Sequence, residues 1–191
     1  MILSDRTIKR LLETGDIIIK PFDPSQLQPA SYDISLGSDF LVFDNTKTIL
    51  IDPRNDTTPG MRKVTVDSEH PFILHPNEFA LAATQEIIGV GPKHIAILNG
   101  KSSLGRLGLV IHATAGFIDP GNELRPTLEL FNVATVPILL YPGMKVGQIV
   151  FEELSEPCER PYGHPELHSK YYKDMGVKAS QIHQNFKEDK A

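Results

Sequence analysis

The segment from Thr127 to Phe151 reads TLELFNVATVPILLYPGMKVGQIVF and holds three short apolar runs. The runs cover residues 127–133, 136–140 and 146–151, and Pro142-Gly143 marks a tight turn between the last two. Short apolar runs bounded by Pro, Gly and Asn are typical of β-strands. The segment therefore predicts three successive strands with no helix between them.

Runs of the same kind occur through most of the chain before this segment. They cover residues 32–36, 40–43, 49–51, 64–66, 79–83, 95–98 and 109–112. Many strands without long helices between them favour a sandwich, a jelly roll or a barrel. The sequence therefore predicts a mainly β fold.

One helix is expected near the start of the chain. Ser4 can cap it, Ile8, Leu11 and Leu12 share one face, and Gly15 offers a left-handed stop. From residue 156 onward the chain becomes rich in Pro, His, Lys, Tyr and Ser. We therefore expect one β-domain over residues 1–155 and an extended arm over residues 156–191, which either stays mobile or closes over something.

The composition of the 191 residues is that of a globular protein, with 40% hydrophobic and 23% charged residues. A net charge of -5 argues against a general nucleic-acid binder. Cys158 is the single cysteine and cannot form an internal disulfide, and the chain starts without the pattern of a secretion signal. No apolar run approaches the roughly 20 residues that span a bilayer. We expect a cytoplasmic protein that is not inserted in a membrane.

Residues 101–106 combine two cations with two hydroxyl groups and small residues. Lys101 and Arg106 supply charge, Ser102 and Ser103 supply hydroxyls, and the small residues let backbone N–H groups approach a ligand. This chemistry suits a polyphosphate. The alternative is a polar turn with a helix cap, and the pattern does not match a Walker loop.

Two carboxylates follow this segment. Glu129 shares a strand face with Thr127 and Phe131, while its leucine neighbours point to the other face. If that face is enclosed, the carboxylate is suited to transfer protons; if not, it is an exposed strand residue. Asp119 precedes Pro120 and is either a site residue or a turn residue.

Three motifs together closely resemble the dCTP deaminase family of the dUTPase-like superfamily. They are GKSSLGRLGL at 100–109, TAGFIDPG at 114–121 and TLELFN at 127–132, and the likeness extends over nearly the whole chain. The resemblance implies a distorted β-barrel of jelly-roll character, with a short N-terminal helix and the C-terminal arm over the active site. It also implies a homotrimer with active sites between subunits, and a hydrolase that deaminates without zinc.

The resemblance implies a role for each matching residue. Glu129 would be the general base and acid that activates water for attack on cytosine C4, while Ser102, Arg106 and the backbone of Ala115 hold that water. Asp119 would accept from the deoxyribose 3′-hydroxyl, and Thr127, Leu128 and Glu129 would read the base. The triphosphate would contact Lys101, Ser102, Ser103, Leu104, Gly105, Arg106, Gln148, Tyr162, Lys170 and Asp174.

Gly116 and Phe117 resemble the branch of the family that also hydrolyses the triphosphate. This branch yields dUMP and pyrophosphate from dCTP, with Mg²⁺ bound largely through the phosphates. The resemblance also makes dUTP a second substrate and dTTP a candidate inhibitor. The alternatives are a deaminase that releases dUTP, a dUTPase without deaminase activity, and a nucleotide-binding module without catalysis.

The chain departs from the family pattern at two places. Asn122 stands where the family has an aromatic residue, before an unusual turn at residues 123–126, and Asp174 stands where the family has Gln. A zinc-dependent deaminase would need Pro-Cys-x-x-Cys, and residues 157–160 hold only Cys158. The seven histidines are scattered, and we expect solvated or structural roles for them.

Overall fold

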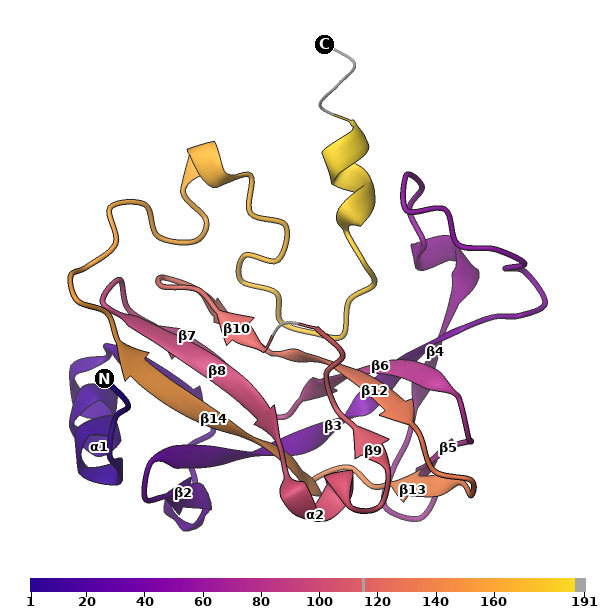
Figure 1. Ribbon diagram of the computed structural model, residues 1–191, viewed down its shortest axis with the longest axis horizontal. Helices are drawn as coiled ribbons and strands as arrows, with labels where there is room; N and C mark the ends of the chain where they lie inside the picture. Colours follow the sequence, from indigo (N-terminus) through magenta and orange to yellow (C-terminus); the bar gives the residue numbers. More distant parts are fainter. Residues whose placement is uncertain (115, 188–191) are drawn as a thin grey trace.

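The computed structural model describes residues 1–114 and 116–187 and consists mainly of short antiparallel strands (Figure 1). The α-helices of this part are α1 (Asp5–Thr14) and α2 (Ser102–Gly105), and the 3-10 helices are η1 (Pro24–Gln26), η2 (Thr58–Gly60), η3 (Pro165–Leu167) and η4 (Ile182–Phe186). The strands are β1 (Ile17–Lys20), β2 (Leu27–Gln28), β3 (Ser31–Phe43), β4 (Met61–Thr65), β5 (Phe72–Leu74), β6 (Phe79–Thr84), β7 (Ile87–Val90), β8 (His94–Gly100), β9 (Leu109–Val110), β10 (Phe117–Ile118), β11 (Glu123–Leu124), β12 (Thr127–Asn132), β13 (Ile138–Leu140) and β14 (Lys145–Glu153).

Helix α1 forms as its sequence predicts. The Ser4 hydroxyl accepts from the Thr7 backbone N–H at 3.5 Å, and Gly15 ends the helix with a φ of 79°. Ile8, on the apolar face of the helix, is fully buried. The cap, the apolar face and the stop were therefore all readable from local sequence.

A curled nine-stranded sheet forms the body of the molecule. Seven strands lie in the order β10-β8-β14-β3-β6-β12-β9, with β2 and β4 also paired to β3. Strand β3 pairs with β14 near its start and with β6 further on, and its register with β6 shifts between Leu36 and Phe40. Smaller sheets, β1-β7-β11 and β13-β5, close the sides. This arrangement confirms the mainly β fold that the strand pattern predicts and the distorted barrel that the family resemblance implies.

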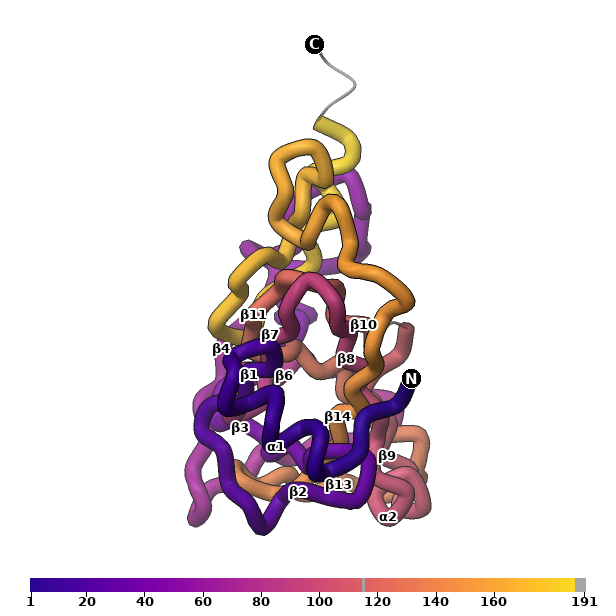
Figure 2. The backbone as a smooth tube through the Cα atoms, turned by 90° about the vertical axis from the view of Figure 1, so that its left-hand side faces the viewer, coloured from indigo at the N-terminus to yellow at the C-terminus, as the bar shows by residue number. Residues whose placement is uncertain are grey.

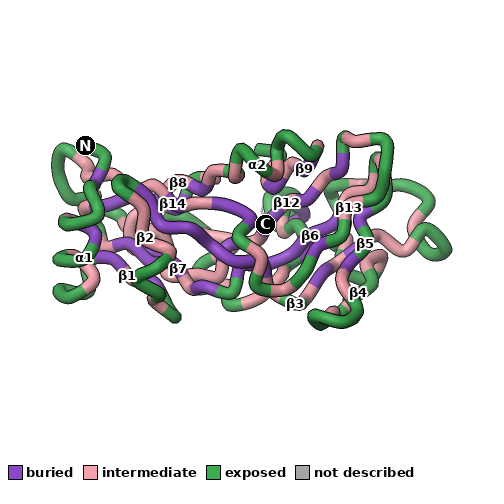
Figure 3. The backbone as a smooth tube through the Cα atoms, turned by 90° about the horizontal axis from the view of Figure 1, so that it is seen from below, coloured by how far each residue is buried: buried purple, intermediate pink, exposed green. Residues whose placement is uncertain are grey.

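The core lies along the central strands of the curled sheet. Viewed from below, buried backbone runs along β14, β3, β6 and β12 (Figure 3). On β12, Leu128 and Leu130 are fully buried while Glu129 between them is half-buried on the opposite face. Burying one such leucine contributes about 1.5–3 kcal/mol, so the alternation fixes which face of β12 carries Glu129.

Residues 49–51 do not form the strand that their apolar character predicts. Ile49 is 93% exposed and lies in a loop over residues 44–60. In this loop Asp44, Asp52 and Asp56 each accept from the backbone N–H two residues further on. Such Asx turns satisfy the backbone locally and compete with strand pairing. The prediction of a strand at residues 49–51 was therefore wrong, because the turns formed by the surrounding aspartates replace strand pairing.

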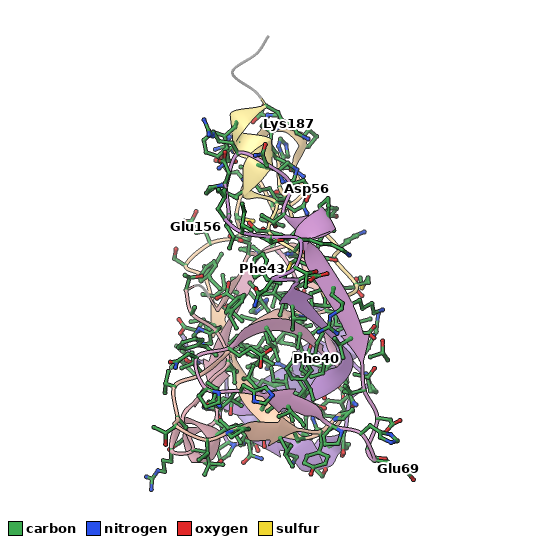
Figure 4. The ribbon with its side chains drawn as sticks, turned by 90° about the vertical axis from the view of Figure 1, so that its right-hand side faces the viewer. Phe40, Phe43, Asp56, Glu69, Glu156 and Lys187 are labelled. Carbon is green, nitrogen blue, oxygen red and sulfur yellow. The ribbon has the colours of Figure 1, made fainter. Side chains whose placement is uncertain are left out.

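After β14 the chain rises away from the sheet to η3, returns beside β10 and β12, and rises again into η4 (Figure 1). This second rise runs on the same side of the molecule as the 44–60 loop (Figure 2). Asp56 and Lys187 both lie in this upper region (Figure 4). The pKa of Asp56 is lowered mainly by its hydrogen bonds with Thr58, with smaller contributions from His183 and Lys187.

No helix of the described chain is long and apolar enough to cross a membrane.

Candidate active site

The Glu129 carboxylate is held by the backbone of the loop that follows β9. Its Oε2 accepts from the Ala113 N–H at 2.7 Å and from the Thr114 N–H at 3.2 Å. The Glu129 backbone N–H in turn donates to the Ile111 carbonyl at 2.9 Å. The Thr114 hydroxyl lies 3.5 Å from both carboxylate oxygens. Glu129 is therefore oriented by backbone groups, and the only described hydrogen-bond partner of Oε1 is the Thr114 hydroxyl at 3.5 Å.

The predicted phosphate-binding residues of the segment 101–106 lie at and around α2. Lys101 is the N-cap of this single turn, and the Arg106 N–H closes it by donating to the Ser102 carbonyl at 3.0 Å. Ser102, Ser103 and Arg106 are exposed. Within the described residues, no hydrogen bond or ion pair joins these three side chains to Glu129. The chain thus presents exposed hydroxyls and an exposed guanidinium at α2.

Lys101 is anchored by a carboxylate that the sequence interpretation did not assign. Asp33 on β3 is only 4% exposed at its side chain, and its Oδ1 accepts from Lys101 Nζ at 2.7 Å. Lys145 Nζ lies 3.8 Å from the other oxygen, so two ammonium groups face one carboxylate. The Lys145 side chain is 44% exposed, so its ammonium group is accessible from solvent. This arrangement suits an anion that approaches from solvent.

Gln148 on β14 lies beside this ion pair. It is the register partner of Asp33, and its Oε1 accepts from the Ser31 hydroxyl at 3.3 Å. The structure therefore brings Lys101 and Gln148, both expected to contact phosphate, close to the same Asp33 carboxylate on β3. Local pattern does not predict this role for Asp33, because the alternation over residues 32–36 is typical of a strand with one polar, solvent-facing side, whereas Asp33 is 3% exposed.

Asp119 follows β10 and is half-buried in a turn. Burial raises the pKa of this carboxyl group, and a backbone hydrogen bond within the residue acts against that shift. The Tyr162 backbone N–H donates to the Pro120 carbonyl at 2.8 Å, which places the first part of the arm against the turn. Burial also raises the pKa of the Tyr162 hydroxyl, with a smaller effect from Asp119.

Gly116 lies where β10 approaches β8. The Leu98 N–H donates to the Gly116 carbonyl at 2.6 Å, and a Cβ added to Gly116 would collide with the Leu98 carbonyl oxygen. The close backbone approach therefore requires glycine here. Phe117 beside it is 50% exposed, which is unusual for a phenylalanine. Ala115 lies outside the described residues.

Lys170 and Asp174 are both on the arm, in different surroundings. Lys170 lines a groove of about 490 Å³ together with His164, His168 and Tyr172, and neither Glu129 nor Asp119 lines it. The Asp174 carboxylate is 13% exposed and lies 3.8 Å from Lys178 Nζ. Asp174 is thus partly neutralised by a lysine four residues later in the chain.

The base-reading residues expected on β12 differ in what they can offer a ligand. Thr127 and Glu129 are half-buried, whereas the side chain of Leu128 is fully buried and only its backbone could face a nucleotide. Among the described residues, no group of three or more His, Cys, Asp or Glu side chains is placed to hold a metal ion.

Comparison with known proteins identifies the family. Residues 2–154 match the family model described as dCTP deaminase-like. A protein named "dCTP deaminase, dUMP-forming" from Nocardioides sp. is 49% identical over 186 residues and covers 97% of each chain. A protein of the same name from Methanobrevibacter smithii is 48% identical over 95% of each chain.

A solved structure shares the fold. The crystal structure of 2′-deoxycytidine 5′-triphosphate deaminase from Agrobacterium tumefaciens superimposes with a TM-score of 0.63 at 23% identity, over 80% of this chain and 48% of that one. The fold expectation and the family resemblance are therefore both confirmed. On the family model and the near-full-length relatives together, this chain belongs to the dCTP deaminase-like family.

Proposed function

We propose that this chain converts dCTP and water into dUMP, ammonia and pyrophosphate. The near-full-length relatives from Nocardioides sp. and Methanobrevibacter smithii carry the name of that activity. The observation on this chain that supports it best is the Glu129 carboxylate, which two backbone N–H groups orient. A positioned carboxylate of this kind is what deamination of a cytosine ring requires.

In the deamination step, Glu129 removes a proton from water while the water oxygen attacks C4 of the base. The bond from C4 to the amino group then breaks, and Glu129 delivers the proton to the departing ammonia. Ser102, Arg106 and the backbone of Ala115 hold the water and stabilise the charge that develops. Thr127 and the Leu128 backbone orient the base.

In the hydrolysis step, a second water attacks the α-phosphate and pyrophosphate leaves. Asp119 holds the deoxyribose hydroxyl and orients this water. Gly116 lets β10 lie close to β8, and this close approach places Asp119, which follows β10. Lys101, Ser103, the backbone of Leu104 and Gly105, Gln148, Tyr162 and Lys170 bind the phosphates. The raised pKa of Asp119 is compatible with a carboxyl group that exchanges a proton with water.

The donor groups fit a Mg²⁺ ion that arrives with the nucleotide. The described residues offer single carboxylates such as Asp119 rather than a cluster of three, so phosphate oxygens would supply most ligands. When bound, Mg²⁺ would neutralise phosphate charge. The chain's own contribution to phosphate binding is the pair of ammonium groups of Lys101 and Lys145 beside Asp33.

We also propose that the active site is completed between the chains of a homotrimer. Ser102 and Arg106 are exposed and make no described contact with Glu129 inside one chain. A second copy that presents α2 to the Glu129 face of its neighbour would bring these groups together. The arm over residues 156–191 then covers the nucleotide held on the barrel of residues 1–155.

Product analysis tests the proposed activity. The protein is incubated with dCTP or dUTP and Mg²⁺, and nucleotides, ammonia and pyrophosphate are quantified. Release of dUMP, ammonia and pyrophosphate from dCTP in equal amounts supports the proposal. Accumulation of dUTP would reduce it to deamination alone, and hydrolysis of dUTP with dCTP untouched would contradict it. Added dTTP tests inhibition in the same assay.

A further inference from the structure

Asn122 and Asp174, the two departures from the family pattern, lie in segments that contact each other. The Asn122 Oδ1 accepts from the Lys173 backbone N–H at 3.2 Å, and the Arg125 backbone N–H donates to the Asp174 carbonyl at 2.7 Å. Two consecutive arm residues thus pair with the turn that follows Asp119. The unusual turn and the unusual arm residue belong to one contact.

On the turn side, Asn122 is fixed from several directions. It is 5% exposed, its N–H donates to the Asp119 carbonyl at 3.2 Å, and its carbonyl accepts from the Val90 N–H at 3.0 Å. Arg125 is also anchored, because its guanidinium donates to the carbonyls of Thr84 and Gln85. The arm therefore docks on a rigid surface.

On the arm side, the backbone adopts a conformation that the contact must stabilise. Lys173 has a φ of 54°, in the left-handed region that residues other than glycine rarely adopt. Its N–H is the donor to Asn122. Such a conformation persists where the surroundings hold it, which agrees with a specific docking contact rather than a loose end.

The arm grips the same turn at a second point. The Tyr162 N–H donates to the Pro120 carbonyl, and a Cβ on Gly121 would collide with the Pro161 side chain. The turn from Asp119 to Asn122 is thus held between Tyr162 on one side and Lys173 on the other. Any opening of the arm at Lys173 would loosen the support of Asp119.

We propose that Asn122 is a positioning residue that latches the arm onto the turn carrying Asp119. Closure over the nucleotide and placement of Asp119 are then one event, because the same hydrogen bonds serve both. The consequence for catalysis rests on the proposed function, but the latch itself does not. An apolar residue at 122 could not accept from Lys173 and would leave that N–H without its partner.

Limited tryptic cleavage of the full-length protein tests the latch without relying on activity. Lys170, Lys173 and Lys178 are cleavage sites on the arm. Asn122→Leu removes the acceptor at similar size, and we expect arm cleavage at least about tenfold faster at a temperature well below unfolding. Asn122→Asp keeps an acceptor oxygen, and Lys173→Gly keeps the donor while suiting the positive φ. Both should stay protected at Lys170 and Lys178, the two cleavage sites that every variant retains.

Asn132→Ala separates the latch from general destabilisation. Asn132 is also buried and also bonded to backbone groups, but at Leu74, Ala134 and Val136 rather than at the arm. We expect this variant to lower Tm without faster arm cleavage. Equal cleavage of wild type and Asn122→Leu would overturn the proposal, as would cleavage of Asn122→Leu and Asn132→Ala in proportion to their loss of Tm.

Kinetics with dCTP then tests the coupling to Asp119. For Asn122→Leu we expect KM to rise about tenfold and dUMP formation to fall more than ammonia release. The separate variant Lys173→Gly should keep the KM and the product ratio of wild type. Unchanged KM and product ratio in a variant with a freely cleaved arm would contradict the coupling. If wild type does not turn over dCTP, the proposed function fails, while the cleavage result still decides the latch.

Discussion

The Ala113 backbone N–H donates to Oε2 of Glu129 across 2.7 Å, and this bond helps to fix the orientation of the carboxylate. Thr114 donates to the same oxygen, and Glu129 returns a backbone bond to Ile111. The loop and β12 therefore hold each other. A backbone-oriented carboxylate loses little freedom during the reaction, which favours proton transfer.

Glu129→Gln should abolish ammonia release while sparing nucleotide binding. The Gln carbonyl can take the place of Oε2, but an amide N–H₂ then stands where the proton acceptor is needed. We expect kcat to fall by about 10²–10⁴-fold with the Kd for dCTP changed less than about threefold. Glu78→Gln is the matched control, because the Glu78 carboxylate accepts from the His75 backbone N–H and from no other described residue. Near-normal deamination by the variant would remove Glu129 from the mechanism.

Asp33→Asn and Lys101→Met should have strongly non-additive effects on stability. Asp33→Asn leaves Lys101 without its carboxylate partner, and Lys101→Met leaves the 4% exposed Asp33 carboxylate with only the longer contact to Lys145 among the described residues. The double variant should therefore lose less stability than the sum of the two single variants. We expect a coupling free energy of about 1–3 kcal/mol from urea unfolding at one fixed protein concentration.

The exposed pair Lys93–Glu153 provides the control for that cycle. It has the same 2.7 Å separation but side chains 45% and 39% exposed. Solvent screening should make its coupling weaker than that of the buried pair. Equal coupling in the two pairs would show that burial of Asp33 does not strengthen its hold on Lys101.

How much of this could be read from the sequence differs between local and long-range features. The α1 cap at Ser4 and the alternation around Glu129 depend on neighbours in sequence, and both were predicted correctly. Strands β1, β7 and β11 were missed because their apolar residues pair only with one another across the chain. Residues 40–43 joined residues 32–36 in one long strand that changes partner midway, which no local pattern encodes.

The same division applies to the candidate site. The motif around Lys101 predicted a cationic loop, but its partner Asp33 lies 68 residues earlier and is brought there by the pairing of β3 with β14. Asn122 and Asp174 looked like two separate irregularities. Their segments are joined by contacts that span about 50 residues, and such contacts are invisible to a reading of neighbours.

Asp119→Asn should stabilise the protein near neutral pH and impair hydrolysis. Burial raises the pKa of Asp119 in the folded state above its ordinary value of 3.8, so the folded state binds the proton more tightly. That contribution is fully present below the unfolded pKa and is lost as pH rises through the folded pKa. The variant should therefore exceed wild type in unfolding free energy at pH 7 and approach it at pH 3.5.

Urea unfolding of both proteins at the two pH values measures this difference, and product analysis measures the cost in activity. We expect the variant to release ammonia from dCTP but to form less dUMP. A stability advantage that is larger at pH 3.5 than at pH 7 would contradict the burial of an ionised Asp119.

Gly116→Ala should destabilise the protein and shift the product from dUMP toward dUTP. The new Cβ would collide with the Leu98 carbonyl, so β10 must move away from β8, at a cost of about 1–3 kcal/mol. Gly176→Ala is the control, since nothing lies within 4 Å of its added Cβ. Thermal unfolding and the ratio of dUMP to dUTP check both effects. A stable variant with an unchanged product ratio would show that the close approach at Gly116 serves neither.

Two inactive variants should restore each other's activity if the site is shared between chains. Glu129→Gln keeps Arg106, and Arg106→Gln keeps Glu129; within one chain the described structure shows no contact between these two side chains. When both variants are co-expressed in equal amounts, random assembly gives both native groups at about one quarter of the sites. We therefore expect about a quarter of wild-type ammonia release from the mixture, while each variant alone stays inactive. Sedimentation of the mixture first confirms that the chains have assembled. A site contained in one chain then predicts no recovery of ammonia release, because every chain in the mixture lacks one of the two groups.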